Sequence, residues 1–147
     1  MDETAVKVGG KEGWIWVCYE PIQKAFLGLW FSWNRNSIVA EMILKELIKK
    51  YGKHPVYTDG ASWYPEACKN LGLAHYIYKQ EDWLCKVMER AVQYVKDRTE
   101  SFDDYFPCRK KECRQQHIWS WIKIFFLHKQ LEYLDIVKRL KGVITLS

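Results

Sequence analysis

The segments that decide the fold are Thr4-Ala-Val-Lys-Val8, Trp14-Ile-Trp-Val-Cys-Tyr19 and Ala25-Phe-Leu-Gly-Leu-Trp-Phe31. The first alternates between two faces, as a strand with one covered face does. The second and third are apolar on both faces, which is typical of strands covered on two sides. Gly9-Gly10 and Pro21 place short turns between them. The pattern predicts three antiparallel strands joined as a meander.

After the meander the apolar spacing becomes helical, from Ile38 to Ile48, with Asn36 or Ser37 as the N-cap and Gly52 at the end. The later predicted elements are a strand at Pro55–Thr58, a helix near Ser62–Leu71, a strand at Leu73–Tyr78, a helix from about Glu81 to Arg98, and a helix or helix pair over Gln115–Leu134 with helix as far as Lys141. The ribonuclease H-like α/β fold has this order. We therefore expect a mixed five-stranded sheet, three meander strands plus two parallel strands, flanked by helices.

The composition fits one folded domain, because 147 residues with 48% hydrophobic and 28% charged residues can build a single core. The longest uncharged stretch, Ala25 to Asn34, is too short for a membrane span of about 20 residues. The start Met-Asp-Glu-Thr has no signal-peptide pattern, so we expect a cytoplasmic protein without a membrane partner. Five cysteines without a CxxC pair favour free thiols.

The positive charge lies in the second half of the chain. Residues 1–85 carry ten Lys and Arg against ten Asp and Glu, whereas residues 86–147 carry thirteen against eight, which accounts for the net charge of +5. A basic half favours a polyanionic partner such as nucleic acid, although a solvated helical face produces the same excess.

Three acids stand where such a fold builds sites. Asp2 heads the first strand, Asp59 ends the fourth, which should lie beside the first, and Glu89 lies within the helix after the fifth. Converging carboxylates need cations, and hard oxygen donors suit Mg²⁺. Two such ions about 3.5–4 Å apart can activate an attacking oxygen and stabilise a leaving one in phosphoryl transfer. Taken singly, each acid also fits a frayed terminus, an ordinary turn or a solvated helix.

The local motifs resemble one family. They are Asp2-Glu-Thr-Ala-Val-Lys-Val-Gly-Gly10, Ser32-Trp-Asn-Arg-Asn36, Thr58-Asp-Gly60 with Trp63-Tyr64, Val87-Met-Glu-Arg90, Val95-Lys-Asp-Arg-Thr99 and Phe102-Asp-Asp-Tyr-Phe-Pro-Cys108. In this order they resemble the catalytic domain of DDE insertion-sequence transposases, more narrowly the insertion-sequence-six-like group in its archaeal style. The resemblance covers about residues 2–130. It implies a ribonuclease H-like catalytic domain over residues 1–130, and we expect residues 131–147 to form a helical tail.

This resemblance implies a metal-dependent DNA recombinase, in which Asp2, Asp59 and Glu89 hold two Mg²⁺ or Mn²⁺ ions. A metal-bound water cuts one strand at a transposon end, and the freed 3′-hydroxyl attacks target DNA. The implied partners are transposon ends, target DNA and a second copy of the chain, in the cytoplasm at the nucleoid and with no small-molecule cofactor. Members normally carry a DNA-recognition segment before the first catalytic aspartate, where this sequence has only Met1. We therefore expect a catalytic domain without its own DNA-binding domain.

Basic residues surround the third acid. Lys86 and Lys96 lie at −3 and +7 from Glu89, on the same helical face. The predicted DNA contacts are Lys86, Arg90, Lys96, Arg98, Arg35 and Trp63. A solvated helix face remains the alternative. The C-x₄-C-x₃-H spacing of Cys108, Cys113 and His117 resembles part of a zinc site, but with three local ligands we favour buried thiols and a helix-surface histidine.

Three other functions stay open. One is an inactive transposase remnant that binds DNA or full-length transposase. Another is a ribonuclease H-like, structure-specific nuclease, which would leave cuts without joining a 3′ end to new DNA. The third is an aromatic-rich interaction module, which predicts no salt-dependent binding to DNA.

Overall fold

The computed structural model describes residues 1–99 and 115–145, with the side chains of the last helix described as far as Glu132. The element order matches the prediction. The elements are β1 Asp2–Val8, β2 Lys11–Glu20, β3 Ala25–Ser32, α1 Ser37–Tyr51, β4 Val56–Thr58, α2 Trp63–Asn70, β5 His75–Ile77, α3 Trp83–Thr99 and α4 Gln115–Thr145. Among the described residues, no helix combines the length and the apolar character needed to cross a membrane.

The predicted antiparallel meander is confirmed, with β2 between β1 and β3. Gly9 and Gly10, with φ of 57° and 79°, form the tight turn between β1 and β2. Asp2 pairs with Val17, so the first residue of β1 lies beside the inner part of β2. This register places the start of β1 against a well-covered strand.

The prediction of one five-stranded sheet is corrected, because the strands divide into a three-stranded and a two-stranded sheet. β4 and β5 pair in parallel, from Val56 opposite His75 to Thr58 opposite Ile77. β4 meets the start of β1 where the Met1 ammonium donates to the carbonyl oxygen of Tyr57 at 2.7 Å. Met1 lies directly before β1 and Tyr57 is the middle residue of β4, and the two strands do not pair as neighbours in one sheet.

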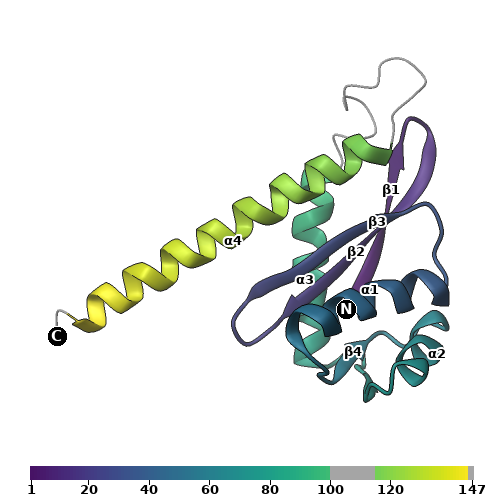
Figure 1. The fold of residues 1–147 in the computed structure, drawn as a ribbon, viewed down its shortest axis with the longest axis horizontal. Coiled ribbons are helices and arrows are strands. Elements are labelled where there is room, and N and C mark those ends of the chain that lie inside the picture. Colours follow the sequence, from purple (N-terminus) through teal and green to yellow (C-terminus); the bar gives the residue numbers. More distant parts are fainter. Residues whose placement is uncertain (100–114, 146–147) are drawn as a thin grey trace.

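One face of the meander packs against α3 and α4. Ile15 and Val17 of β2 are buried there with Val95 of α3 and with Ile118 and Ile122 of α4. The two α4 residues are four positions apart, so both face the sheet. The beginning of α4 is thus part of the core, whereas its far end extends away from the body of the molecule (Figure 1).

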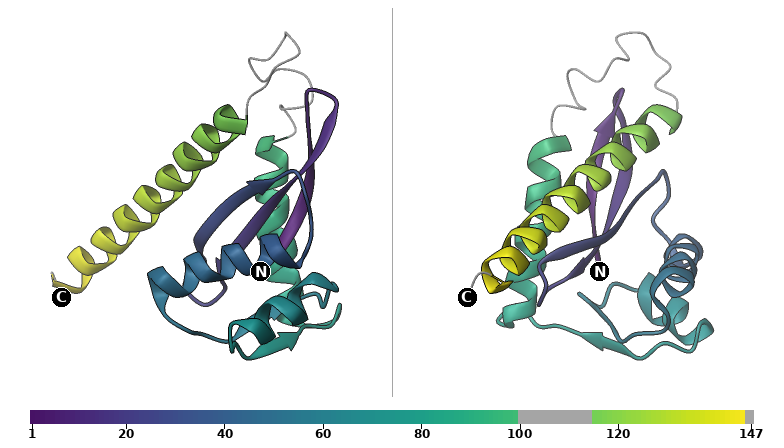
Figure 2. Two further views of the ribbon diagram at one scale, coloured as in Figure 1. Left: turned by 45° about the vertical axis from the view of Figure 1, so that its right-hand side comes forward. Right: turned by 60° about the vertical axis from the view of Figure 1, so that its left-hand side comes forward.

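The opposite face of the meander packs against α1 and α2. Trp16 of β2 is fully buried there with Leu44 of α1 and Tyr64 of α2. The rings of Trp16 and Tyr64 meet edge to face, with centroids 6.1 Å apart. The right-hand view of Figure 2 shows the meander between the α3–α4 pair and the α1–α2 pair. The molecule therefore has three layers, as a ribonuclease H-like fold requires.

Helix ends follow the predicted capping residues. The Asn36 side chain accepts a hydrogen bond from the amide of Val39 at 3.0 Å and caps α1, which ends at Gly52 with φ of 81°. α4 is one continuous helix that passes residue 130. Where the catalytic domain ends and the tail begins stays a prediction.

Candidate active site

The three predicted acids lie on or directly beside three separate elements. Asp2 is the first residue of β1, Asp59 directly follows β4, and Glu89 lies on α3. Asp2 is half-buried, while Asp59 and Glu89 are exposed. Burial is the largest cause that raises the pKa of Asp2, and the charges of Asp59 and Glu89 raise it further. Asp59 and Glu89 therefore both lie within electrostatic reach of Asp2.

The turn after β4 sets the position of Asp59. Gly60 adopts φ of 85°, and a Cβ atom there would lie 2.9 Å from the side chain of Ile77. Only glycine fits this conformation and this close approach. The buried Thr58 hydroxyl accepts a hydrogen bond from the Gly60 amide at 3.1 Å and lies 2.7 Å from Nε2 of His75. These contacts hold the turn against β5.

Two neighbouring groups respond to the same negative charges. Burial raises the pKa of Tyr78, and Asp2 and Asp59 raise it further. Burial also raises the pKa of Cys85, whose Sγ donates to Oε1 of Glu89 at 3.7 Å, and the charge of Glu89 adds to that rise. Tyr78 and Cys85 therefore stay protonated near neutral pH and add no further negative charge to the site.

The donor set suits a hard divalent cation, because it consists of carboxylate oxygens that repel one another without a counter-ion. As these side chains lie, however, the described part of the chain contains no group of three or more His, Cys, Asp or Glu close enough to hold a metal ion. Asp59 and Glu89 are exposed side chains whose carboxylates can change rotamer. The chemistry of the acids fits a metal, and their role as ligands stays a prediction.

A second cluster lies on the other face of β1, around a residue that the sequence interpretation missed as a functional residue. The Glu3 side chain is 4% exposed and lies 3.6 Å from the Arg35 guanidinium. The Tyr64 hydroxyl donates to its other carboxylate oxygen. Arg35 stacks on the rings of Trp14 and Trp63, at 3.7 and 4.5 Å from their centroids. The sequence signal for this residue was its place beside Asp2, within the first of the family motifs.

Four of the five predicted basic contacts lie on the exposed side of α3, and the fifth, Arg35, belongs to the cluster around Glu3. Lys86, Arg90, Lys96 and Arg98 are all exposed. Arg98 already makes internal contacts, since its guanidinium stacks on Tyr94 at 3.3 Å and donates to the Tyr94 carbonyl at 3.1 Å. The structure thus presents Lys86 and Lys96 on the same helical face as Glu89.

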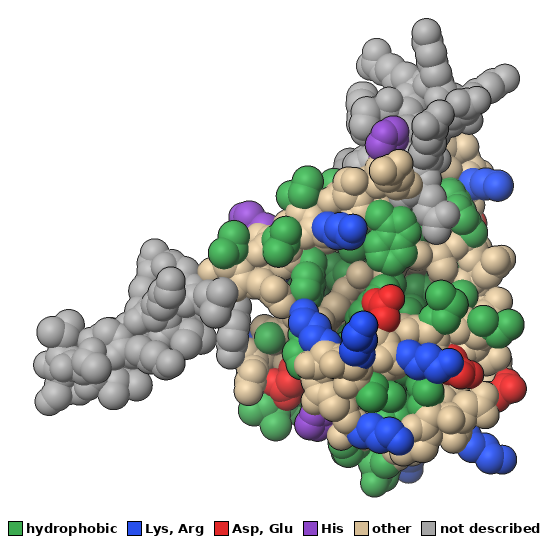
Figure 3. Space-filling view, viewed as in Figure 1, with side chains coloured by type: hydrophobic (Ala, Val, Ile, Leu, Met, Phe, Trp, Pro, Cys, Tyr) green, Lys and Arg blue, Asp and Glu red, His purple; other side chains and the backbone are tan. Residues whose placement is uncertain are grey.

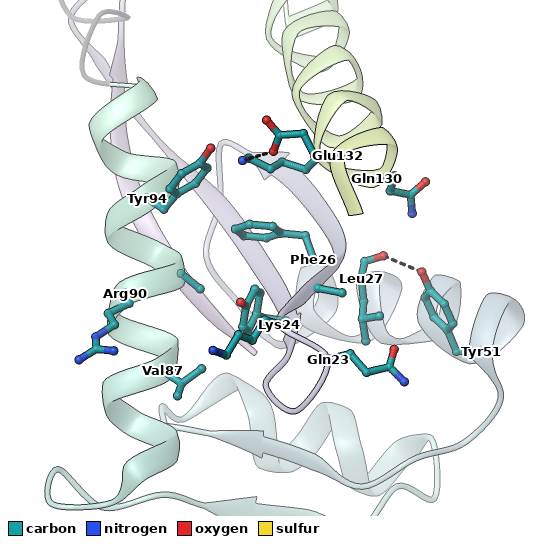
Figure 4. Close-up of a pocket in the computed structure, with 14 residues that line it drawn as sticks. Gln23, Lys24, Phe26, Leu27, Tyr51, Val87, Arg90, Tyr94, Gln130 and Glu132 are labelled. Atoms are coloured by element: carbon teal, nitrogen blue, oxygen red, sulfur yellow. Dashed lines mark hydrogen bonds and ion pairs between the residues drawn. The ribbon is translucent and has the colours of Figure 1, made fainter. Parts of the chain in front are cut away.

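Arg90 stands at the edge of a groove between the β2–β3 turn, α3 and α4 (Figure 4). The groove has a volume of about 600 Å³ and includes Phe26 and Tyr94 in its lining. Figure 4 shows the Arg90 guanidinium directed away from Phe26, toward the outside of α3. Arg90 can therefore reach a ligand that lies along the outer side of α3.

Two further predictions concern a basic surface and a zinc site. The face of the molecule in Figure 3 shows Lys and Arg side chains interspersed with Asp and Glu, so this face presents no continuous basic surface. Cys108 and Cys113 lie outside the described residues, and the zinc hypothesis therefore stays untested. His117 is exposed on α4.

The fold is similar to that of a solved protein. A chain in the cryo-EM structure of the simian T-cell lymphotropic virus intasome, in complex with PP2A regulatory subunit B56 gamma, superposes with a TM-score of 0.54. The match covers 70% of this chain and 40% of that chain, at 16% sequence identity. At this identity the likeness concerns the fold, and it agrees with a ribonuclease H-like architecture.

The sequence itself belongs to a transposase family. Residues 1–124 match the family model described as the DDE domain of transposases, so the chain is a member of the DDE transposase domain family. It is also 31% identical, over 128 residues, to an uncharacterised protein of Methanocaldococcus jannaschii. That match covers 86% of this chain and 58% of the relative, so this chain spans little more than half of the relative's length.

Proposed function

We propose that this domain catalyses divalent-metal-dependent cleavage and joining of DNA strands, with Asp2, Asp59 and Glu89 as the metal-binding carboxylates. The observation that carries the proposal is that the Met1 ammonium, directly before Asp2, donates to the carbonyl oxygen of Tyr57, two residues before Asp59, at 2.7 Å. In this arrangement the charges of Asp59 and of Glu89 on α3 both raise the pKa of Asp2. Membership of the DDE transposase domain family supports the same assignment. The finer assignment to the insertion-sequence-six-like group is part of the proposal.

A bound divalent cation, Mg²⁺ or Mn²⁺, would supply the positive charge that three carboxylates require and would polarise phosphate oxygens. The residues of this chain would do the rest. Asp2 is held by its place in β1 and by the Glu3 amide, which donates to Oδ1 of Asp2 at 2.8 Å. Oδ1 of Asp59 accepts from the Ala61 amide at 3.0 Å, which leaves its other oxygen for a cation.

The DNA backbone would lie along the exposed side of α3. Lys86 and Lys96 flank Glu89 on one helical face, and Arg90 is directed to the outside of the same helix. Arg98, Arg35 and Trp63 remain proposed contacts, although all three make internal contacts. A homodimer and transposon-end and target DNA as partners belong to the same proposal.

A strand-joining assay on branched DNA tests the activity. In this substrate, base pairing holds a free 3′-hydroxyl beside the phosphodiester that it attacks, so no separate end-recognition domain is needed. We expect a joined strand with Mn²⁺ or Mg²⁺ and none with Asp59→Asn. DNA cleavage without a joined product would favour the alternative function of a structure-specific nuclease.

The absence of any product, with DNA binding equal in wild type and Asp59→Asn, would favour the inactive remnant. One observation favours that second candidate: the described carboxylates are not already arranged closely enough to hold an ion.

A further inference from the structure

The start of β1 is anchored on the side opposite the acids by a cluster that we name the Glu3 cluster: Glu3, Arg35, Tyr64, Trp14 and Trp63. Its central carboxylate is almost fully buried, with a side chain 4% exposed. A buried carboxylate is costly unless it is paired and hydrogen-bonded. Here the Arg35 guanidinium and the Tyr64 hydroxyl meet that requirement from two different directions.

The members of the Glu3 cluster come from four parts of the fold. Glu3 belongs to β1, Arg35 to the segment between β3 and α1, and Tyr64 to the first turn of α2. The Arg35 guanidinium also stacks on Trp14 of β2 and Trp63 of α2. A planar guanidinium can pair with a carboxylate and stack on aromatic rings at once, which an ammonium group cannot. The cluster therefore joins the meander to α2.

This connection joins the two segments that carry Asp2 and Asp59. Asp2 precedes Glu3 in β1, and four residues separate Asp59 from Tyr64. The Ala61 amide donates to Asp59, and the Ala61 carbonyl accepts from the Tyr64 amide at 3.1 Å, so the turn and α2 are continuous. Any movement of α2 relative to β1 would change the separation of the two acids.

We propose that Glu3, with Arg35 and Tyr64, is a positioning residue that sets the distance between Asp2 and Asp59 and thereby the affinity of the site for a divalent cation. The metal in this proposal rests on the proposed function. The link between the Glu3 cluster and the positions of Asp2 and Asp59 rests only on the contacts described above. The proposal also gives Arg35 and Trp63 a role inside the protein that is distinct from the DNA contact proposed for them above.

The test compares Glu3→Gln and Tyr64→Phe with wild type. Glu3→Gln keeps the size of the side chain and removes the ion pair, and Tyr64→Phe removes the hydroxyl while it keeps the ring against Trp16. The matched control is Glu12→Gln, an exposed carboxylate of β2 outside the cluster. The measurements are Mn²⁺ titration by calorimetry, amide hydrogen exchange at residues 2–5 and 61, and the thermal unfolding midpoint.

We expect both cluster variants to bind Mn²⁺ about tenfold more weakly and to exchange faster at residues 2–5 and 61. The control Glu12→Gln should change neither the Mn²⁺ affinity nor the exchange rates. All variants should unfold cooperatively. If wild type binds Mn²⁺ and both cluster variants bind it equally well, the positioning role is wrong. If wild type binds no Mn²⁺, the proposed function fails, and unchanged exchange in the variants would then overturn the positioning role as well.

Arg35→Lys separates positioning from DNA contact. The positioning role predicts weaker Mn²⁺ binding with DNA affinity retained, because lysine keeps the positive charge but loses the stacked plane. Weaker DNA binding with unchanged Mn²⁺ affinity would overturn the positioning role and support a DNA contact.

Discussion

Asp2 and Glu3 are neighbours in β1 and serve opposite faces of the sheet. Asp2 lies with the charges of Asp59 and Glu89, whereas Glu3 pairs with Arg35 and Tyr64. The alternation of side chains along a strand produces this separation. One short segment therefore holds both an acid of the candidate active site and the buried carboxylate that anchors the strand.

Stability should depend on pH through the acids of β1. Burial raises the pKa of Asp2 and of Glu3 above their ordinary values of 3.8 and 4.5. A carboxyl with a raised folded-state pKa stabilises the fold fully below its unfolded pKa, and this contribution is lost as pH rises through the folded pKa. The contribution of these two groups to the free energy of unfolding should therefore decrease as pH rises above the ordinary carboxyl pKa range.

Asp2→Asn tests this pH dependence by urea unfolding at several pH values. An asparagine oxygen can still accept the Glu3 amide but carries no charge. We expect a higher free energy of unfolding than wild type at pH 7 and a smaller decrease of that free energy as pH rises from about 4 to 7. If the free energies of unfolding of wild type and Asp2→Asn change in parallel with pH, the pKa of Asp2 is not raised in the folded protein.

α4 should be part of the folded core through its first turns. Ile118 is fully buried, so Ile118→Ala should lower the free energy of unfolding by about 2–5 kcal/mol. Ile124, on the same helix, is 68% exposed, and Ile124→Ala should change it by less than about 0.5 kcal/mol. Urea unfolding of both variants measures the difference. Equal effects would mean that α4 does not dock on the meander in solution.

DNA binding should depend on the exposed side of α3. Replacing Lys86 and Lys96 together by glutamine should weaken DNA binding. It should also reduce the log–log slope of affinity against salt concentration by about one unit for each phosphate that is no longer neutralised. Fluorescence anisotropy over a salt series measures both quantities. The control is Lys49→Gln, an exposed residue of α1 across the sheet. If the Lys49→Gln substitution in α1 changes the DNA affinity and the salt slope as much as the substitutions in α3 do, the attraction of DNA to the protein is non-specific.

The fold was largely predictable because its signals are local. The two-sided apolar strands, the capping residue Asn36 and the terminating Gly52 all lie within the segments that they define. The division into two sheets was not predictable in this way. It depends on where β1 and β4 meet in space, and their contact at Met1 and Tyr57 joins residues far apart in the chain.

The candidate site was predictable in part. The positions of Asp2, Asp59 and Glu89 at strand ends and on α3 follow from the element order. The role of Glu3 was hidden, because an acidic residue in a strand looks solvent-exposed until the structure shows Tyr64 and Arg35 against it. Likewise, the sequence indicates a DNA contact for Arg35 but not the stacking of its guanidinium on Trp14 and Trp63.

The most direct test of the central claim is calorimetric titration of Mn²⁺ into wild type, Asp59→Asn and Glu89→Gln, at neutral pH. The account predicts binding to wild type and loss of that binding in both variants, since each contributes a carboxylate to the same site. Binding that survives in both variants, or no binding to wild type, would contradict the claim that these acids form a metal site.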